Sequence, residues 1–325
     1  MIPTVSVADL NRSVCADPVE DDKRKGDITM TARFEGVYCP SITITHDDGS
    51  LDLDLWGKHL DHLADSGLNG VLLFGSIGEF FAYPLEVKKQ AVEFAVKRVA
   101  GRMDVLVGIG DTDLNKVIDF AKFGERIGVD ALVAVSPYYF GPSDGAAERY
   151  FDAIAEATEL PVILYNFPDR TGSDLSPALV ARLAAKHANI VGIKDTVDTI
   201  SHTRKVIRAV HEVNPDFAVL SGYDEYYLVN RVSGGSGVIC GLTNVEPETY
   251  VKLHHAYQTG DYATAVACAE RVSHLEAVYD CADLFIAAIK GAVKAKGLPI
   301  STLIREPAVQ LTDAQYAQIQ ELLAE

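Results

Sequence analysis

The sequence lacks the marks of membrane proteins and of disulfide-bonded proteins. No segment approaches the roughly 20 consecutive apolar residues that a membrane-spanning helix requires. The five cysteines are scattered over 325 residues without a CxxC pair, which is typical of free thiols in a reducing compartment. The N-terminus has no apolar core of the kind found in secretory signals, so we expect a cytoplasmic protein with no membrane partner.

Positive charge is also scarce. The chain has 29 Lys and Arg against 46 Asp and Glu, which gives a net charge of −17. Because nucleic-acid affinity depends on basic residues that neutralise phosphates, this balance argues against a nucleic-acid partner. It argues equally against docking on an anionic membrane surface. Hydrophobic residues make up 48% of the chain, an ordinary share for a globular protein with a large core.

Residues 1–33 differ from the rest of the chain. They contain the charge cluster Glu20–Lys25 and show no sustained hydrophobic period. We interpret them as a flexible N-terminal extension, with a start site assigned too far upstream as the alternative.

From Gly36 onward, short apolar runs rich in β-branched residues alternate with longer amphipathic segments. The runs predict strands at Val37–Thr45, Gly70–Phe74, Asp104–Ile109, Ala131–Ser136, Val162–Asn166, Ile190–Lys194, Ala218–Ser221 and Gly237–Cys240. Helical spacing is clearest at Tyr83–Val99, Thr112–Ile127, Gly145–Thr158 and Ser176–His187, and a short helix is expected around Tyr226–Val232. Strands that each precede a helix favour a closed (β/α)₈ TIM barrel of the α/β class over an open sheet.

We place this barrel at residues 34–258. Residues 259–325 contain further helical patterns, at Asp261–Val278 and Cys281–Lys296. They predict a C-terminal helical appendage to the barrel.

Lys194 is the most informative residue at the expected mouth of the barrel. The carboxyl ends of the strands form this mouth, where the catalytic residues of TIM barrels lie. Lys194 ends the apolar run Asn189–Ile193, and lysine is almost never buried unless it is paired or used. Burial favours the neutral amine, which is a nucleophile. A lysine that extends into solvent or pairs with Asp195 is the alternative.

Motifs around this lysine resemble those of a known superfamily. They are Gly75-Ser76-Ile77-Gly78-Glu79, Ser136-Pro137-Tyr138-Tyr139, Leu164-Tyr165-Asn166-Phe167-Pro168, Thr171-Gly172 and Gly192-Ile193-Lys194-Asp195. In their order and spacing the chain resembles the pyruvate-dependent aldolases, which include dihydrodipicolinate synthase, N-acetylneuraminate lyase and the 2-keto-3-deoxy sugar acid aldolases. The resemblance implies class I chemistry through a Schiff base with pyruvate or another 2-keto acid.

The resemblance also implies individual roles. Lys194 would form the imine, and Tyr165 would act as the general acid and base. Ser76 would link Tyr165 to Tyr139, which in the family reaches in from a neighbouring subunit. The chain is therefore expected to form a dimer at least, and usually a homotetramer built as a dimer of dimers.

Further residues would shape the pocket. The resemblance implies that backbone N–H groups of Ser76 and Ile77 hold the substrate carboxylate. Gly222 and the carbonyl of Ile239 would line the pocket. For Tyr138, packing in the core or at an interface is the simpler interpretation.

No cofactor or metal ion is expected. His59 and His62 are three residues apart on a predicted surface helix, and His254 and His255 are adjacent. We interpret both pairs as solvated side chains rather than as metal ligands.

The substrate is predicted from details within the motifs. Ile77 stands where dihydrodipicolinate synthases usually carry threonine, whereas Gly78-Glu79-Phe80, Lys194–Asp198 and Ser221–Asp224 resemble 2-keto-3-deoxygluconate and 2-keto-3-deoxypentonate aldolases. Thr196 and Tyr223 could hydrogen-bond a polyhydroxylated chain.

Arg170 favours a different substrate. It matches the arginine that holds the carboxylate of aspartate semialdehyde in the synthases, as a guanidinium can do bidentately. A loop arginine paired with Asp169 or another acid is the alternative, and the guanidinium could also bind the far end of an acidic sugar derivative.

The leading prediction is an aldolase that cleaves a 2-keto-3-deoxy sugar acid to pyruvate and an aldehyde. 4-Hydroxy-tetrahydrodipicolinate synthase and a Schiff-base 2-keto-3-deoxy acid dehydratase remain alternatives. A barrel that only binds a ligand, without catalysis, is the remaining interpretation.

Overall fold

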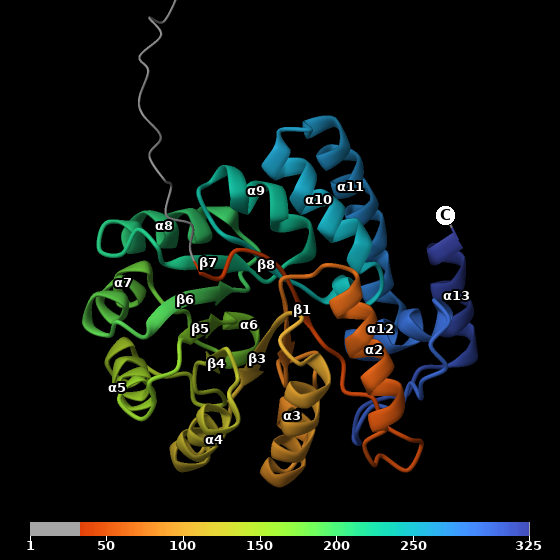
Figure 1. Cartoon of the computed structure of the whole chain (residues 1–325), viewed down its shortest axis with the longest axis horizontal. Helices are drawn as coiled ribbons and strands as arrows, with labels where there is room; N and C mark the ends of the chain where they lie inside the picture. The colour runs from red at the N-terminus through yellow and green to blue at the C-terminus, as the bar shows by residue number, and fades with distance from the viewer. Residues whose placement is uncertain (1–32, 325) are drawn as a thin grey trace, which may run out of the picture. The chain divides into compact units, whose positions relative to one another are not determined.

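The computed structural model describes residues 33–324, so the predicted N-terminal extension lies outside the described residues except for Arg33. Eight parallel strands pair in chain order, and the last pairs with the first, which closes the barrel (Figure 1). The strands are β1 (Gly36–Pro40), β2 (Gly70–Leu73), β3 (Asp104–Gly108), β4 (Ala131–Val135), β5 (Val162–Asn166), β6 (Ile190–Asp195), β7 (Ala218–Ser221) and β8 (Gly237–Ile239). The predicted TIM barrel is confirmed.

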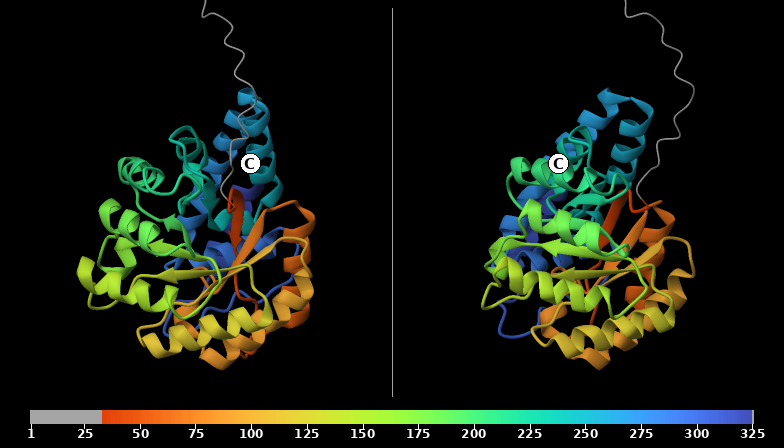
Figure 2. Two further views of the ribbon diagram at one scale, coloured as in Figure 1. Left: turned by 60° about the vertical axis from the view of Figure 1, so that its left-hand side comes forward. Right: turned by 90° about the vertical axis from the view of Figure 1, so that its left-hand side faces the viewer.

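Helices surround this barrel on its outside, as both views of Figure 2 show. Those that connect or follow the strands are α2 (Leu53–Asp65), α3 (Leu85–Val99), α4 (Leu114–Ile127), α5 (Asp144–Ala155), α7 (Pro177–Lys186), α8 (Ile200–His211), α9 (Tyr227–Val232) and α10 (Pro247–Thr259). An additional short helix, α6 (Pro168–Thr171), directly follows β5. None of the helices between residues 33 and 324 has both the length and the apolar character needed to cross a bilayer.

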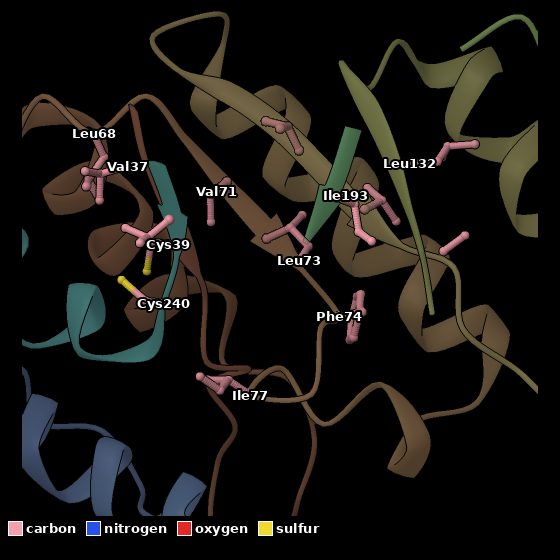
Figure 3. Close-up of a cluster of buried hydrophobic side chains, with 14 of the residues drawn as sticks. Val37, Cys39, Leu68, Val71, Leu73, Phe74, Ile77, Leu132, Ile193 and Cys240 are labelled. Carbon is pink, nitrogen blue, oxygen red and sulfur yellow. The ribbon is translucent and has the colours of Figure 1, made fainter. Parts of the chain in front are cut away.

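The strands are buried on both faces because they separate two apolar layers. Successive strand residues point to opposite faces. One set, which includes Tyr38, Leu72 and Leu106, clusters mainly with other strand residues and fills the barrel interior. The alternate set, which includes Val71 and Leu73 (Figure 3), belongs to a cluster that also contains helix residues such as Leu60 and Ala91. This double burial explains the nearly continuous apolar runs in the sequence.

The first strand is shorter than predicted. β1 ends at Pro40, whereas the apolar run continues to Thr45. Beyond Pro40 the polar side chains bond to a loop and to α2: the Thr43 hydroxyl donates to the Gly78 carbonyl at 2.8 Å, and the Trp56 indole donates to Ser41 at 3.0 Å. Residues 41–45 are therefore buried although they do not belong to a strand.

The C-terminal region contains α11 (Tyr262–Leu275), α12 (Phe285–Ala295) and α13 (Asp313–Ala324). The first two lie within the predicted helical patterns, and the third lies beyond them. An ion pair connects α12 to the barrel: Lys290 Nζ lies 2.6 Å from Glu79 Oε1, with both side chains fully buried. Lys290 also donates to the Leu303 carbonyl at 2.7 Å. The region thus packs against the loop that follows β2.

Candidate active site

Lys194 and Tyr165 lie side by side at the carboxyl end of the barrel. They are register partners on β6 and β5, and their exposed fractions are only 4% and 3%. The Lys194 Nζ lies 4.5 Å from the centroid of the Tyr165 ring. The parallel pairing of the two strands therefore places an amine and a phenol together in a secluded position.

Asp195, the residue after Lys194, is bound by other partners. Its carboxylate accepts hydrogen bonds from Asn166 Nδ2 at 3.0 Å and from Thr203 Oγ1 at 2.7 Å. His202 Nδ1 lies 3.0 Å from the same carboxylate. The geometry therefore does not support the alternative in which Lys194 forms an ion pair with Asp195.

His202 lies between two carboxylates behind the candidate site. Its Nε2 is 3.2 Å from Asp174, on the side away from Asp195. Burial alone would lower the pKa of His202, but its contacts with Asp174 and Asp195 outweigh burial and raise the pKa to about 10. An imidazolium thus neutralises this pair of acids at the end of β6.

Ser76 reaches Tyr165 from the loop after β2. The two hydroxyl oxygens are 3.3 Å apart, a long hydrogen bond. The loop requires its glycine: a Cβ on Gly78 would lie 2.9 Å from the Phe74 backbone nitrogen. Glu79 ends the turn in a left-handed conformation, with φ of 56°. Its carboxylate faces Lys290 and not the barrel mouth.

A cavity of about 590 Å³ opens above Lys194. All of the predicted site residues except Tyr139 line it: Ser76, Ile77, Tyr165, Arg170, Lys194, Thr196, Gly222, Tyr223 and Ile239. Thr196 and Gly222 are in close contact, because a Cβ on Gly222 would overlap the Thr196 hydroxyl. Arg170 is exposed, and its guanidinium lies 5.8 Å from the Phe167 ring centroid.

Tyr139 lies apart from this cavity. Its side chain is 85% exposed, and the neighbouring Phe140 is 87% exposed. Tyr139 also has φ of 79°, an uncommon conformation for a residue with a side chain. Tyr138, in contrast, packs its ring edge-on against Phe80 at 5.9 Å. Within one chain, Ser76 and Tyr165 come together but Tyr139 does not join them.

Asp224 anchors the far part of the cavity wall. Its carboxylate accepts hydrogen bonds from the backbone of Gly241 and Leu242 and from the hydroxyls of Tyr250 and Tyr279, at 2.6–3.1 Å. Burial, reinforced by Asp224, raises the pKa of the Tyr279 hydroxyl well above its ordinary value. The phenol therefore remains a hydrogen-bond donor, and Asp224 links β7 to the segment that follows α11.

Comparison with known proteins identifies the family of this chain. The dihydrodipicolinate synthetase family matches residues 33–325. The chain belongs to this family.

Several relatives align with most of this chain and with nearly all of their own length. YagE of Escherichia coli (strain K12), provisionally named a 2-dehydro-3-deoxy-D-gluconate aldolase, is 37% identical over 294 residues, covering 90% of this chain and 97% of YagE. YjhH of the same strain, provisionally named a 2-dehydro-3-deoxy-D-pentonate aldolase, is 36% identical over 291 residues, covering 90% and 97%. A 4-hydroxy-tetrahydrodipicolinate synthase of Methanosphaerula palustris is 36% identical over 297 residues, covering 90% and 99%.

A solved structure of the same family shows the same fold. The crystal structure of Escherichia coli YagE in complex with pyruvate matches with a TM-score of 0.88 at 37% identity, covering 90% of this chain and 98% of that one. The chain is therefore a lyase of the dihydrodipicolinate synthetase family, built as a TIM barrel with C-terminal helices.

Part of the cavity wall was not predicted from the sequence. Residues from the C-terminal region, among them Glu276, Tyr279, Asp280 and Asp283, line the same cavity as Lys194. The available sequence signal is a group of acidic residues that interrupts the apolar pattern between α11 and α12. It does not reveal which part of the barrel these residues meet.

The interpretation of two histidines as solvated is wrong. His59 is buried in α2, where its Nε2 lies 3.0 Å from the Asn244 side-chain oxygen. Burial lowers the pKa of His59 to about 4. His254 is partly buried, with its Nδ1 2.6 Å from the Tyr227 hydroxyl. Both side chains therefore have structural hydrogen-bond partners.

Proposed function

We propose that the chain is a class I aldolase that cleaves a 2-keto-3-deoxy sugar acid to pyruvate and an aldehyde through an imine on Lys194. The observation that carries the proposal is the buried amine of Lys194, which lies against Tyr165 inside a cavity of about 590 Å³. An amine enclosed in a cavity beside a phenol is placed to attack a keto carbon and form an imine.

The reaction begins at the substrate keto carbon. The Lys194 amine attacks this carbon, and loss of the former keto oxygen as water leaves a protonated imine. Removal of the proton from the C4 hydroxyl then allows the C3–C4 bond to break. Its electrons move into the imine to form an enamine, and the aldehyde leaves. Protonation at C3 and hydrolysis of the imine release pyruvate and restore the amine.

Tyr165 is the proposed general acid and base for these proton transfers. Its hydroxyl is 3.3 Å from Ser76 Oγ, which can pass a proton onward. The substrate carboxylate would be held by the backbone N–H groups of Ser76 and Ile77. Because the substrate binds as an imine, these groups fix the carbon skeleton relative to the phenol.

Tyr139 would complete the proton relay from a second copy of the chain. Its 85% exposed ring and the adjacent Phe140 form an apolar projection that a single chain leaves uncovered. Exposed aromatic pairs of this size are characteristic of interfaces. We therefore propose a homotetramer built as a dimer of dimers, with Tyr139 crossing one interface.

Two relatives, YagE and YjhH, carry names that support a sugar acid as substrate. Arg170, which lines the cavity, and the synthase relative from Methanosphaerula palustris favour a second candidate. In that candidate, 4-hydroxy-tetrahydrodipicolinate synthase, the enamine of pyruvate attacks aspartate semialdehyde. The two activities share the imine and differ in the aldehyde that the enamine meets.

A side-by-side substrate assay tests the proposal. Purified protein is given 2-keto-3-deoxygluconate, the corresponding pentonate, or pyruvate with aspartate semialdehyde, with Lys194→Ala as the control. We expect release of pyruvate and an aldehyde from a sugar acid. Exclusive turnover of the semialdehyde would establish the synthase. Loss of water from the sugar acid without an aldehyde product would establish the dehydratase.

A further inference from the structure

Glu276 extends the cavity wall beyond the residues assigned to the imine chemistry. It begins the 3₁₀ turn Glu276–Cys281, which follows α11, and lines the same cavity as Lys194. Its Oε1 atom is fully buried and has no hydrogen-bond partner among the described residues. A buried polar atom without a partner is destabilising, so a ligand group that satisfied it would gain affinity.

The neighbours of Glu276 keep its proton in place. Asp224 accepts four hydrogen bonds, which stabilise its negative charge. Burial, the nearby carboxylates of Asp224, Glu225 and Asp280, and a side-chain hydrogen bond with Glu225 raise the pKa of Glu276 to about 10. Near neutral pH, Glu276 is therefore a carboxylic acid that can both donate and accept a hydrogen bond. A hydroxyl group of a ligand can donate to the unpartnered Oε1 oxygen.

A second group in the cavity also lacks a partner. The Thr196 side chain is 6% exposed, and its Oγ1 atom has no hydrogen-bond partner among residues 33–324. Thr196 lines the cavity together with Glu276. The Thr196 hydroxyl lies against Gly222, so Glu276 is the group of this wall that we assign to a ligand hydroxyl.

The charge of the wall disfavours an anionic chain end. Asp224, Asp280 and Asp283 line the cavity beside Glu276. The lining cation Arg170 is exposed, as are Asp280 and Asp283, so solvent screens the charges of all three. Repulsion from the buried carboxylate of Asp224 is screened much less. A phosphate at the far end of the substrate would meet this repulsion.

We propose that Glu276 is a specificity-determining residue that hydrogen-bonds a hydroxyl of the aldehyde-derived half of the substrate, and that the acidic wall restricts this half to uncharged polyhydroxylated chains. This inference rests on the proposed aldolase function, because it assigns a role within the same cavity. The substrate class that follows is a non-phosphorylated 2-keto-3-deoxy sugar acid.

The first test compares two acceptor aldehydes in the condensation direction. The wild-type enzyme is assayed with pyruvate and either D-glyceraldehyde or D-glyceraldehyde 3-phosphate. Repulsion from the buried carboxylate of Asp224 predicts a kcat/KM for glyceraldehyde at least about tenfold higher than for the phosphate. Equal values, or preference for the phosphate, would overturn the assignment of the acidic wall.

The second test uses a matched pair of variants. Glu276→Gln keeps a neutral donor and acceptor of the same size, whereas Glu276→Leu removes both capacities. We expect Glu276→Leu to raise the KM for glyceraldehyde about tenfold, the equivalent of one lost buried hydrogen bond. Glu276→Gln should stay within about threefold of the wild type and keep its discrimination against the phosphate.

Trapping of pyruvate on Lys194 with borohydride separates this inference from the proposed function. A trapped adduct in every variant shows a folded chain with a working imine step. If the adduct forms and both variants keep the wild-type KM, Glu276 does not contact the substrate. If Glu276→Gln loses as much as Glu276→Leu, the side chain does not act as a neutral acid. Absence of the adduct in the wild type would instead reject the aldolase function itself.

Discussion

The ring of Tyr165 lies against the amine of Lys194, with Nζ 4.5 Å from the ring centroid and the two residues paired in register on β5 and β6. This relationship is fixed by backbone pairing and not by flexible loops. It holds a proton donor next to the atom that would carry the imine. Rigid placement on strands keeps reacting groups at a constant separation, which favours catalysis.

Removal of the Tyr165 hydroxyl tests its role in proton transfer. Tyr165→Phe keeps the ring against Lys194 but cannot donate or accept a proton. Loss of a general acid and base predicts a fall in kcat of about 10²–10⁴-fold. Tyr38→Phe is a matched control, because its buried hydroxyl bonds Asp104 at the start of β3, away from the mouth. Steady-state kinetics should show little change in Tyr38→Phe, and a similar loss in both variants would contradict the assignment.

Tyr139 offers a test of the proposed assembly. Tyr139→Phe should slow turnover far more than it weakens pyruvate capture, because the hydroxyl moves protons and does not bind pyruvate. If Tyr139 acts across an interface, mixed oligomers of Tyr139→Phe and Lys194→Ala contain some sites with both wild-type groups. Co-refolded or co-expressed mixtures should then be more active than either variant alone. No gain in the mixtures would place Tyr139 outside a shared site.

The barrel could be predicted from the sequence because its signals are local. The bounds of β5 and β7 agree with the apolar runs, and Lys194 stands out as a charge at the end of such a run. His59 could not be predicted in the same way. Its position on α2 resembles a surface position until Asn244, far away in the sequence, provides a buried partner.

The acidic wall of the cavity escaped prediction for a similar reason. Glu276 lies near the end of the predicted helical pattern Asp261–Val278, and Asp280 lies in the gap before Cys281–Lys296. Their neighbours in the sequence do not indicate that they face Lys194. That position depends on how the C-terminal region packs, through contacts such as the Tyr279 hydroxyl with Asp224 at 2.6 Å. Side-chain contacts between distant segments are not encoded in the periodicity of either segment.

The buried ion pair of Glu79 and Lys290 makes a prediction about stability. Lys290→Met leaves the Glu79 carboxylate buried without its partner at 2.6 Å. Removing one member of a buried pair costs about 3–5 kcal/mol of unfolding free energy. The double variant Glu79→Gln/Lys290→Met removes both charges and should recover a large part of that loss. Denaturant unfolding at one protein concentration measures the effect, and equal losses in the single and double variants would argue against an electrostatic origin.

His202 predicts a dependence of stability on pH. Its folded-state pKa of about 10 lies above the ordinary histidine value of 6.5, because Asp174 and Asp195 outweigh burial. A raised pKa means that the folded state holds the proton more tightly. The contribution is therefore complete below about pH 6.5 and is lost as the pH rises toward 10. His202→Gln should flatten the stability profile in this range.

His62 provides the control for this titration. Its side chain is 51% exposed on α2, so His62→Gln should leave the slope between pH 6.5 and 10 unchanged. Thermal or chemical unfolding across this range compares the two variants. An identical slope in the wild type and His202→Gln would show that His202 does not hold its proton through the two carboxylates.

The central claim is that Lys194 forms a covalent imine with pyruvate. The most direct measurement is reduction with borohydride in the presence of pyruvate, followed by mass spectrometry of the intact chain and of its peptides. We predict one pyruvate-derived adduct per chain, located on Lys194, and none in Lys194→Ala. An active enzyme whose Lys194 remains unmodified under these conditions would contradict the account.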